Sequence, residues 1–284
     1  MLQNEPEYKI SMGFGREHEI LLRSLYTKVL SIMTTMRSRF LVYPPALVIT
    51  DSEPIPFFDN DISRFRCGEY SVKAMELDGF VTLVESEIWL KINHIHGLLA
   101  AIYDAAGRLD TITAYVVIIQ IIMHEYFHHI ANHDRYTRYL NARYDRMNRK
   151  YLDLRDTVSA AEQEFLDFIY NKTTDDQEEM MVNYNTMRYY YLVMTEFLRR
   201  TYPSIMADNA SRDVYRRAMK NLDLIYDYFA AVSIEHSPKS FLDPKRTGWK
   251  RQVRIPNKSS EEAFDALSQL EYAATPINII LINA

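Results

Sequence analysis

Apolar residues recur along most of this chain every three or four positions, the spacing that places side chains on one face of an α-helix. Between residues 16 and 40 they predict an amphipathic helix that ends before Tyr43-Pro44-Pro45, because proline disfavours helical backbone at and before its own position. The same pattern, with its capping and breaking residues, predicts further helices over residues 88–106, from 110 onward, 158–170, 175–200, 207–232 and 259–273.

Short β-prone runs interrupt the helices in the first third of the chain. Ala46–Thr50 is one such run. Asp78-Gly79 lies between two others, Tyr70–Met75 and Phe80–Val84, and Asp-Gly is a common two-residue hairpin turn. Ile277–Leu281 predicts a terminal strand. Helical segments outnumber these strands, so the predicted fold class is α+β and predominantly helical, with a small β-sheet.

Composition narrows the class of protein. The 284 residues are 48% hydrophobic and 25% charged, which is ordinary for a soluble globular chain with a sizeable core. A net charge of −5 gives no reason to expect a nucleic-acid partner. The basic loop over residues 239–258 is the one stretch that could contact a different partner. Gly-rich phosphate-binding motifs do not occur.

Targeting signals are not evident. The acidic start of the chain lacks the basic and apolar regions of a signal peptide, and a single cysteine, Cys67, excludes an intramolecular disulfide framework. The longest apolar stretch, Ile112–Met123, is shorter than the roughly 20 residues that span a bilayer. We therefore expect no membrane segment and a cytoplasmic location.

One motif carries recognisable chemistry. His124-Glu125-Tyr126-Phe127-His128 is an H-E-x-x-H run at the polar end of the apolar stretch. Four residues advance about 400° around an α-helix and about 6 Å along it, so the two histidines share a face and can bind one Zn²⁺. Glu125 is then close enough to act on water at the metal. The spacing therefore predicts a catalytic zinc site with Glu125 as general base.

A catalytic zinc usually takes three protein ligands, so a third is needed. Asp134 has the spacing of the third ligand in the metzincin pattern, but Ala131 stands where that pattern has a glycine. Glu162 and Glu164 on the next predicted helix are the other main candidates. Glu162 comes level with His128 if the chain turns back between Arg143 and Met147, and it is the preferred third ligand.

These motifs resemble the zincin metallopeptidases. More narrowly, His133 after His128, followed by Ser159-Ala160-Ala161-Glu162, resembles a metallopeptidase-like domain found beside von Willebrand factor A-like domains. That family shows H-E-x-x-H-x-x-x-x-H and then Ala-Ala-Asp, so the resemblance puts Glu162 in the place of the aspartate ligand. It implies a zinc-dependent peptidase acting on a protein or peptide substrate.

The resemblance also implies a domain organisation: a zincin-like core over residues 1–170 and a helical C-terminal region over 171–284, packed as one unit. In such cores an edge strand beside the cleft pairs with extended substrate, and Phe80–Val84 is our candidate. Two alternatives remain. One is a catalytically inactive zinc-binding structural or interaction protein. The other is a di-iron site, which requires a second E-x-x-H that this chain lacks.

Overall fold

A computed structural model describes residues 8–10, 16–36, 43–50, 66–77, 80–148, 175–203, 209–236 and 253–273 of the chain. Its four-stranded sheet has the order β1-β2-β4-β3. The strands are β1 (Tyr8–Ile10), β2 (Ala46–Thr50), β3 (Gly68–Leu77) and β4 (Phe80–Lys91). Strand β2 is parallel to both of its neighbours, and β3 pairs antiparallel with β4.

The predicted hairpin is confirmed, with Leu77 opposite Phe80, but β4 is longer than expected. The helix predicted from Ile88 begins at Ile92 instead. Ile88 and Leu90 are fully buried on one face of the strand, and β4 pairs with β2 as far as Lys91 and with β3 as far as Leu90. Sheet pairing, which depends on β2 and β3, therefore overrides the local helical pattern.

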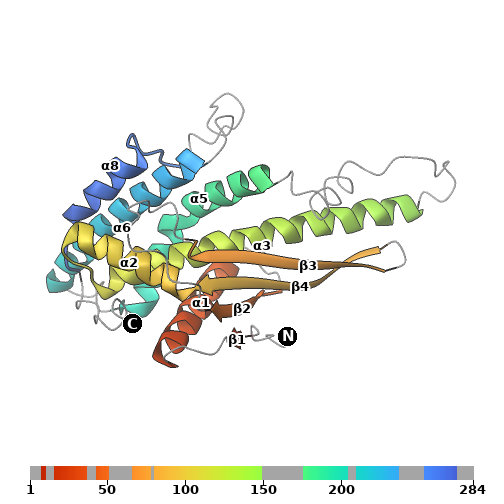
Figure 1. Ribbon diagram of the computed structural model, residues 1–284, viewed down its shortest axis with the longest axis horizontal. Helices are drawn as coiled ribbons and strands as arrows, with labels where there is room; N and C mark the ends of the chain where they lie inside the picture. Colours follow the sequence, from red (N-terminus) through yellow and green to blue (C-terminus); the bar gives the residue numbers. More distant parts are fainter. Residues whose placement is uncertain are drawn as a thin grey trace.

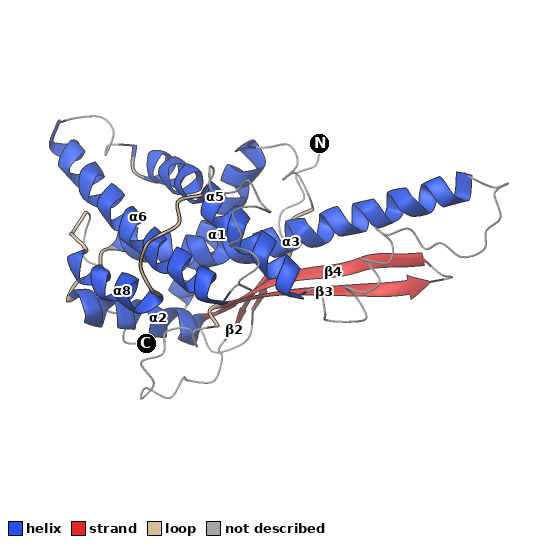
Figure 2. Ribbon diagram, turned by 90° about the horizontal axis from the view of Figure 1, so that it is seen from above, coloured by secondary structure: helices blue, strands red, loops and turns tan. Residues whose placement is uncertain are grey.

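The helices are α1 (Arg16–Met36), α2 (Ile92–Ala106), α3 (Thr111–Asn148), α5 (Asp175–Thr201), α6 (Asn209–His236) and α8 (Ser260–Asp265), with the 3₁₀ turn η7 (Ala266–Gln269). Gly107 ends α2 as predicted, in the left-handed conformation with φ 63°. The fold is therefore a mostly helical α+β arrangement. In Figures 1 and 2, α3 runs alongside the β3–β4 hairpin, and α6 and α8 lie at the end of the molecule opposite the tip of that hairpin.

Helix α3 begins where the sequence predicts and ends later. Asp110 precedes it and accepts a hydrogen bond from the Thr113 N–H at 2.7 Å. The turn expected between Arg143 and Met147 is wrong, because the helix continues through Asn148. That stretch contains neither proline nor glycine to end a helix. The predicted helix over 158–170 lies outside the described residues.

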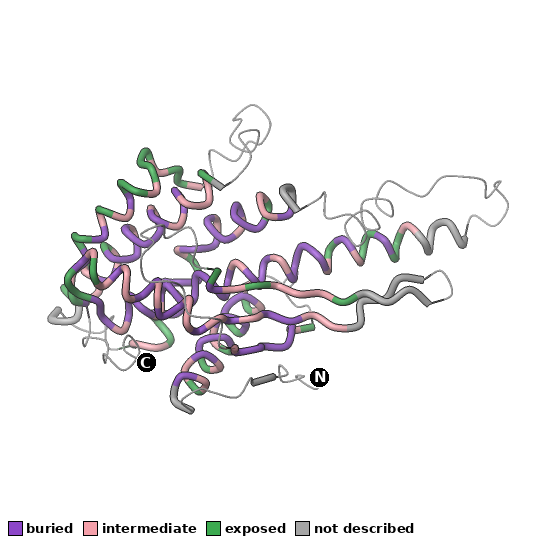
Figure 3. Tube along the Cα trace, in the orientation of Figure 1, coloured by how far each residue is buried: buried purple, intermediate pink, exposed green. Residues whose placement is uncertain are grey.

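One hydrophobic cluster joins the sheet to the long helices. Its largest fully buried side chains include Tyr26 of α1, Tyr126 of α3, and Tyr190 and Phe197 of α5. Figure 3 shows buried segments on α1, α3 and α5 and along β2. Both predicted regions, 1–170 and 171–284, supply residues to this cluster, but the boundary between them falls outside the described residues.

The last described segment is fixed to α6. Ser259 and Glu262 form the predicted capping box, and the helical turns after it end at Gln269, short of the predicted Ala273. Arg254 lies 4.8 Å over the Tyr226 ring and bonds Asp227 at 2.7 Å, so this part of the basic loop is anchored locally. Residues 239–252 of that loop, and the predicted strand over 277–281, lie outside the described residues.

Candidate metal centre

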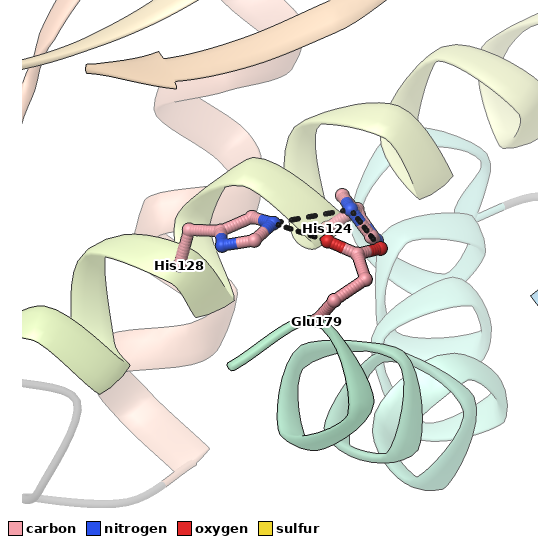
Figure 4. A group of neighbouring side chains, drawn as sticks. All are labelled: His124, His128 and Glu179. Atoms are coloured by element: carbon pink, nitrogen blue, oxygen red, sulfur yellow. Dashed lines mark hydrogen bonds and ion pairs between the residues drawn. The ribbon is translucent and has the colours of Figure 1, made fainter. Parts of the chain in front are cut away.

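Three side chains from two helices converge beside the sheet. His124 and His128 project from one face of α3, with their Nε2 atoms 3.3 Å apart. Helix α5 brings Glu179 against both of them: its Oε1 lies 3.4 Å from Nε2 of His124 and its Oε2 lies 3.2 Å from Nε2 of His128. Figure 4 shows the carboxylate reaching from α5 toward the two imidazole rings.

This cluster could hold a metal ion. One ligand atom from each of the three residues lies within 4.8 Å of the others. Two imidazole nitrogens and one carboxylate form a donor set that catalytic zinc sites use, and it leaves one position of a tetrahedral ion for water or substrate. The residues present therefore fit a divalent metal of this kind.

The carboxylates of the cluster stabilise positive charge at His128, whereas burial disfavours it at His124. Burial by itself would lower the pKa of His128, but hydrogen bonds to Glu178 and Glu179 raise that pKa to about 10. Burial would raise the pKa of Glu179, and its contacts with His128 and His124 instead lower it to about 2. His124 has its pKa lowered to about 4, chiefly by burial. The carboxylates thus stabilise a cation here, and a metal ion is one such cation.

A second carboxylate orients His128. Glu178 is adjacent to Glu179 in the chain, and its Oε1 lies 2.6 Å from Nδ1 of His128. Arg135 donates to Glu178 Oε2 at 2.5 Å and Asn132 donates to its Oε1 at 3.1 Å. When His128 donates its Nδ1 proton to Glu178, its Nε2 keeps a lone pair directed at the cluster. Glu178 and Arg135 are both buried, so this arrangement is held in place.

Glu125 lies against the start of β3. A Cβ placed on Gly68 would lie 2.6 Å from Glu125 Oε1, so only glycine leaves room for this carboxylate in its present position. Burial raises the pKa of Glu125 to about 7. Glu125, His124 and Glu179 line the same cavity. The arrangement therefore places a carboxylate of near-neutral pKa beside three metal-ligand side chains.

Strand β3 is anchored to α3 next to this cluster. The Tyr70 ring stacks on the His128 ring with centroids 6.3 Å apart, and its hydroxyl lies 3.4 Å from Nδ1 of His129. His129 Nε2 lies 2.7 Å from the carbonyl oxygen of Tyr43 and donates to it, which leaves Nδ1 as the acceptor. Phe80–Val84, our expected edge, belongs to β4, which lies inside the strand order, and the edge strand beside the site is β3.

Sequence reasoning found three of the four residues that meet here. His124, Glu125 and His128 lie together as expected, and Glu179 was missed. In the sequence, the acidic run 175–179 indicates only a favourable start for a helix, because carboxylates there complement the helix dipole. Asp134 is exposed on the continuing helix and does not belong to the cluster. Glu162 and Glu164 lie outside the described residues, so their role as ligands stays a prediction.

Comparisons with protein-family models, with curated proteins and with solved structures find no match to this chain. Among the helices in the described parts of the chain, none is long and apolar enough to cross a membrane. The case for a function therefore rests on the geometry of this site.

Proposed function

We propose that this chain is a zinc-dependent metallopeptidase in which His124, His128 and Glu179 hold the metal and Glu125 is the general base. The observation that carries the proposal is the position of Glu125. It lies one residue after a ligand, lines the cavity shared with His124 and Glu179, and is buried with a raised pKa. A metal site that served only structure has no use for an acid in this place.

Each residue has a chemical task in this proposal. A zinc ion held by the three ligands would act as a Lewis acid that makes water more acidic and polarises a carbonyl group. Glu125 accepts the proton of the attacking water and delivers it to the leaving amine. Burial raises the pKa of Glu125, which makes its carboxylate a stronger base for the first of these transfers. Glu178 holds His128 in the orientation that directs Nε2 toward the metal.

Strand β3 is suited to hold an extended substrate. It pairs with β4 on one side, and its other edge has no partner among the described strands. Gly68 at its start contacts Glu125, and Tyr70 stacks on His128, so this edge runs beside the cluster. Backbone groups on such an edge pair with the backbone of a bound peptide. We therefore assign substrate pairing to β3 in place of Phe80–Val84.

Glu125→Gln tests the proposal directly. Glutamine keeps the shape of the side chain but cannot accept the proton, so zinc content and thermal unfolding should stay at wild-type values. Hydrolysis of a complex peptide mixture, mapped by mass spectrometry, should fall by about 10²- to 10⁴-fold.

Glu87→Gln is a matched control, because Glu87 is buried to the same degree, 5% exposed against 6% for Glu125, but does not line the cavity. This control should retain hydrolysis. Equal cleavage by wild type and Glu125→Gln, with zinc bound in both, would rule out a peptidase centre and leave the zinc-binding structural protein as the better reading.

A further inference from the structure

The cavity that contains Glu125 extends beyond the metal cluster. It has a volume of about 270 Å³ and reaches from the start of β3, past His124 and Glu179, to α6. Gln120 and Ile121 line it one helical turn before His124 and Glu125, so it follows α3 for about 6 Å toward the N-terminus of that helix. A substrate bound at the cluster can therefore place one side chain in this space.

The walls of the extension are apolar and aromatic. Leu98 comes from α2, Ile121 from α3, and Tyr228, Phe229 and Val232 from α6. The cavity as a whole, including its part beside His124, Glu125 and Glu179, has a volume of about 270 Å³. The charged residues that line the cavity, Arg66, Glu125 and Glu179, lie just before β3, on α3 and on α5, whereas the lining residues from α2 and α6 are uncharged. A charged group packed against α2 and α6 would therefore lose its hydration without gaining a partner there.

Two side-chain amides line this cavity, and they differ in their hydrogen bonds. Asn183 uses both ends: its Nδ2 donates to Glu179 Oε1 at 3.1 Å, and its Oδ1 accepts from Ser233 at 3.2 Å. Gln120 is only 5% exposed, and its Oε1 is buried without a hydrogen-bond partner. A buried acceptor of this kind is costly to leave unsatisfied. A hydrogen-bond donor on a bound molecule would satisfy it.

We propose that this cavity is the specificity pocket of the site and takes an aromatic side chain that carries a hydrogen-bond donor, tyrosine or tryptophan, with Gln120 Oε1 accepting from that donor. The ring matches the walls, and the hydroxyl or indole N–H matches the acceptor. Phenylalanine and leucine fill the space but leave Oε1 unsatisfied, which is how buried polar groups discriminate between otherwise similar ligands. As a statement about cleavage, this inference rests on the proposed peptidase function.

Binding of small compounds tests the pocket without requiring hydrolysis. The N-acetyl amides of tyrosine, tryptophan, phenylalanine and leucine are titrated into zinc-loaded protein and followed by NMR. The tyrosine and tryptophan compounds should bind about tenfold more tightly than the phenylalanine compound, as one neutral hydrogen bond provides. Gln120→Met keeps the size of the side chain and should remove that preference.

Gln269→Met is the matched control, because Gln269 is an exposed glutamine outside the cavity, and it should keep the preference. Val232→Phe fills the pocket and should weaken all four compounds, while zinc content and thermal unfolding show that the protein is intact. Equal binding of the four compounds to wild type, or a preference that survives in Gln120→Met, would overturn the inference.

Cleavage mapping separates this inference from the function on which it rests. Cuts adjacent to tyrosine and tryptophan in wild type, and no such enrichment in Gln120→Met, support both. A binding preference without any cleavage supports the specificity pocket and contradicts the proposed peptidase function. Cleavage that is not enriched at tyrosine and tryptophan, together with equal binding of the four compounds, supports the peptidase function and contradicts the specificity pocket.

Discussion

Two pairs of histidines in this molecule have nearly the same ring geometry and very different surroundings. The His124 and His128 rings lie 5.0 Å apart at 72°, and the His18 and His96 rings lie 5.2 Å apart at 67°. The first pair lies on one helix, whereas α1 and α2 bring the second pair together. Ring geometry by itself therefore does not distinguish a metal centre from a packed core.

Carboxylates make the difference. Glu178 and Glu179 contact the first pair and raise the pKa of His128, overcoming the effect of burial. Both ring nitrogens of His96 are buried without a hydrogen-bond partner, and burial lowers the pKa of His96 to about 4. Within the described ranges, only His124, His128 and Glu179 form a group of three or more side chains able to hold a metal. The acidic start of α5 thus turns one histidine pair into a candidate site.

Replacing one histidine of each pair gives the largest expected contrast. His128→Ala removes a ligand, so zinc should fall from about one per chain to near none, and hydrolysis should be lost with it. His96→Ala removes a ring of the same size from the pair without carboxylates and should leave zinc content unchanged. Elemental analysis of both variants checks this, and equal zinc in the two would contradict the assignment of the metal to the first pair.

Alanine substitution also distinguishes the two candidates for the third zinc ligand, Glu179 and Glu162. Glu179→Ala removes the carboxylate that contacts both rings, and zinc affinity should fall by more than about 100-fold, beyond the loss expected for an outer residue. Glu162→Ala should leave affinity unchanged. Competition with a chelator measures both constants. The reverse pattern would make Glu162 the ligand, as the sequence resemblance implies.

Gly68→Ala tests whether the position of Glu125, beside the His124 and His128 pair, matters for hydrolysis. The added Cβ would lie 2.6–2.9 Å from the Glu125 carboxyl group and Cγ, so the general base must move. Displacement of a catalytic group by about 1 Å costs on the order of 100-fold in rate. Hydrolysis should fall by that amount while zinc content stays constant. A variant with normal hydrolysis would show that the position of Glu125 is not critical.

Glu178→Gln removes the negative charge beside His128 and leaves the three metal-ligand residues unchanged. Glutamine can still accept a hydrogen bond from His128, but the negative charge that Glu178 presents to His128 and Arg135 is lost. Outer residues of this kind contribute about 10- to 100-fold to metal affinity. Zinc affinity should therefore fall within that range, as measured by chelator competition. An unchanged affinity would mean that position alone, and not charge, orients the ring.

The second pair, His18 and His96, should affect how stability depends on pH and should not affect metal binding. The pKa of His96 is about 4 in the folded protein, against 6.5 in the unfolded chain, so only the unfolded state takes up a proton between these values. Stability from this group is thus complete above pH 6.5 and lost as pH falls toward 4. The loss is on the order of 2 kcal/mol, less than the full shift because solvent reaches part of the ring.

His96→Leu should accordingly flatten the fall in the free energy of unfolding between neutral and acidic pH. Urea unfolding of both proteins at several pH values measures it. The same slope in wild type and variant would show that His96 does not titrate differently on folding.

The sequence by itself determined the elements that depend on neighbouring residues. The i, i+4 spacing put His124 and His128 on one face of α3, since a helix repeats the same geometry wherever it forms. Asp78-Gly79 marked the hairpin, Gly107 ended α2, and Ser259 with Glu262 formed the capping box. Each of these predictions needed only a few consecutive residues, and each is confirmed.

Only the tertiary structure decided what comes from far along the chain. Glu178 lies 50 residues after His128, and with Glu179 it reaches the site because α5 packs against α3. The expected turn near residue 145 was the premise for Glu162 as ligand, and α3 runs past it. Strand β3 became the edge at the site because β4 also pairs with β2. Local spacing cannot determine such contacts, because they depend on the path of the whole chain and on which elements bury their faces together.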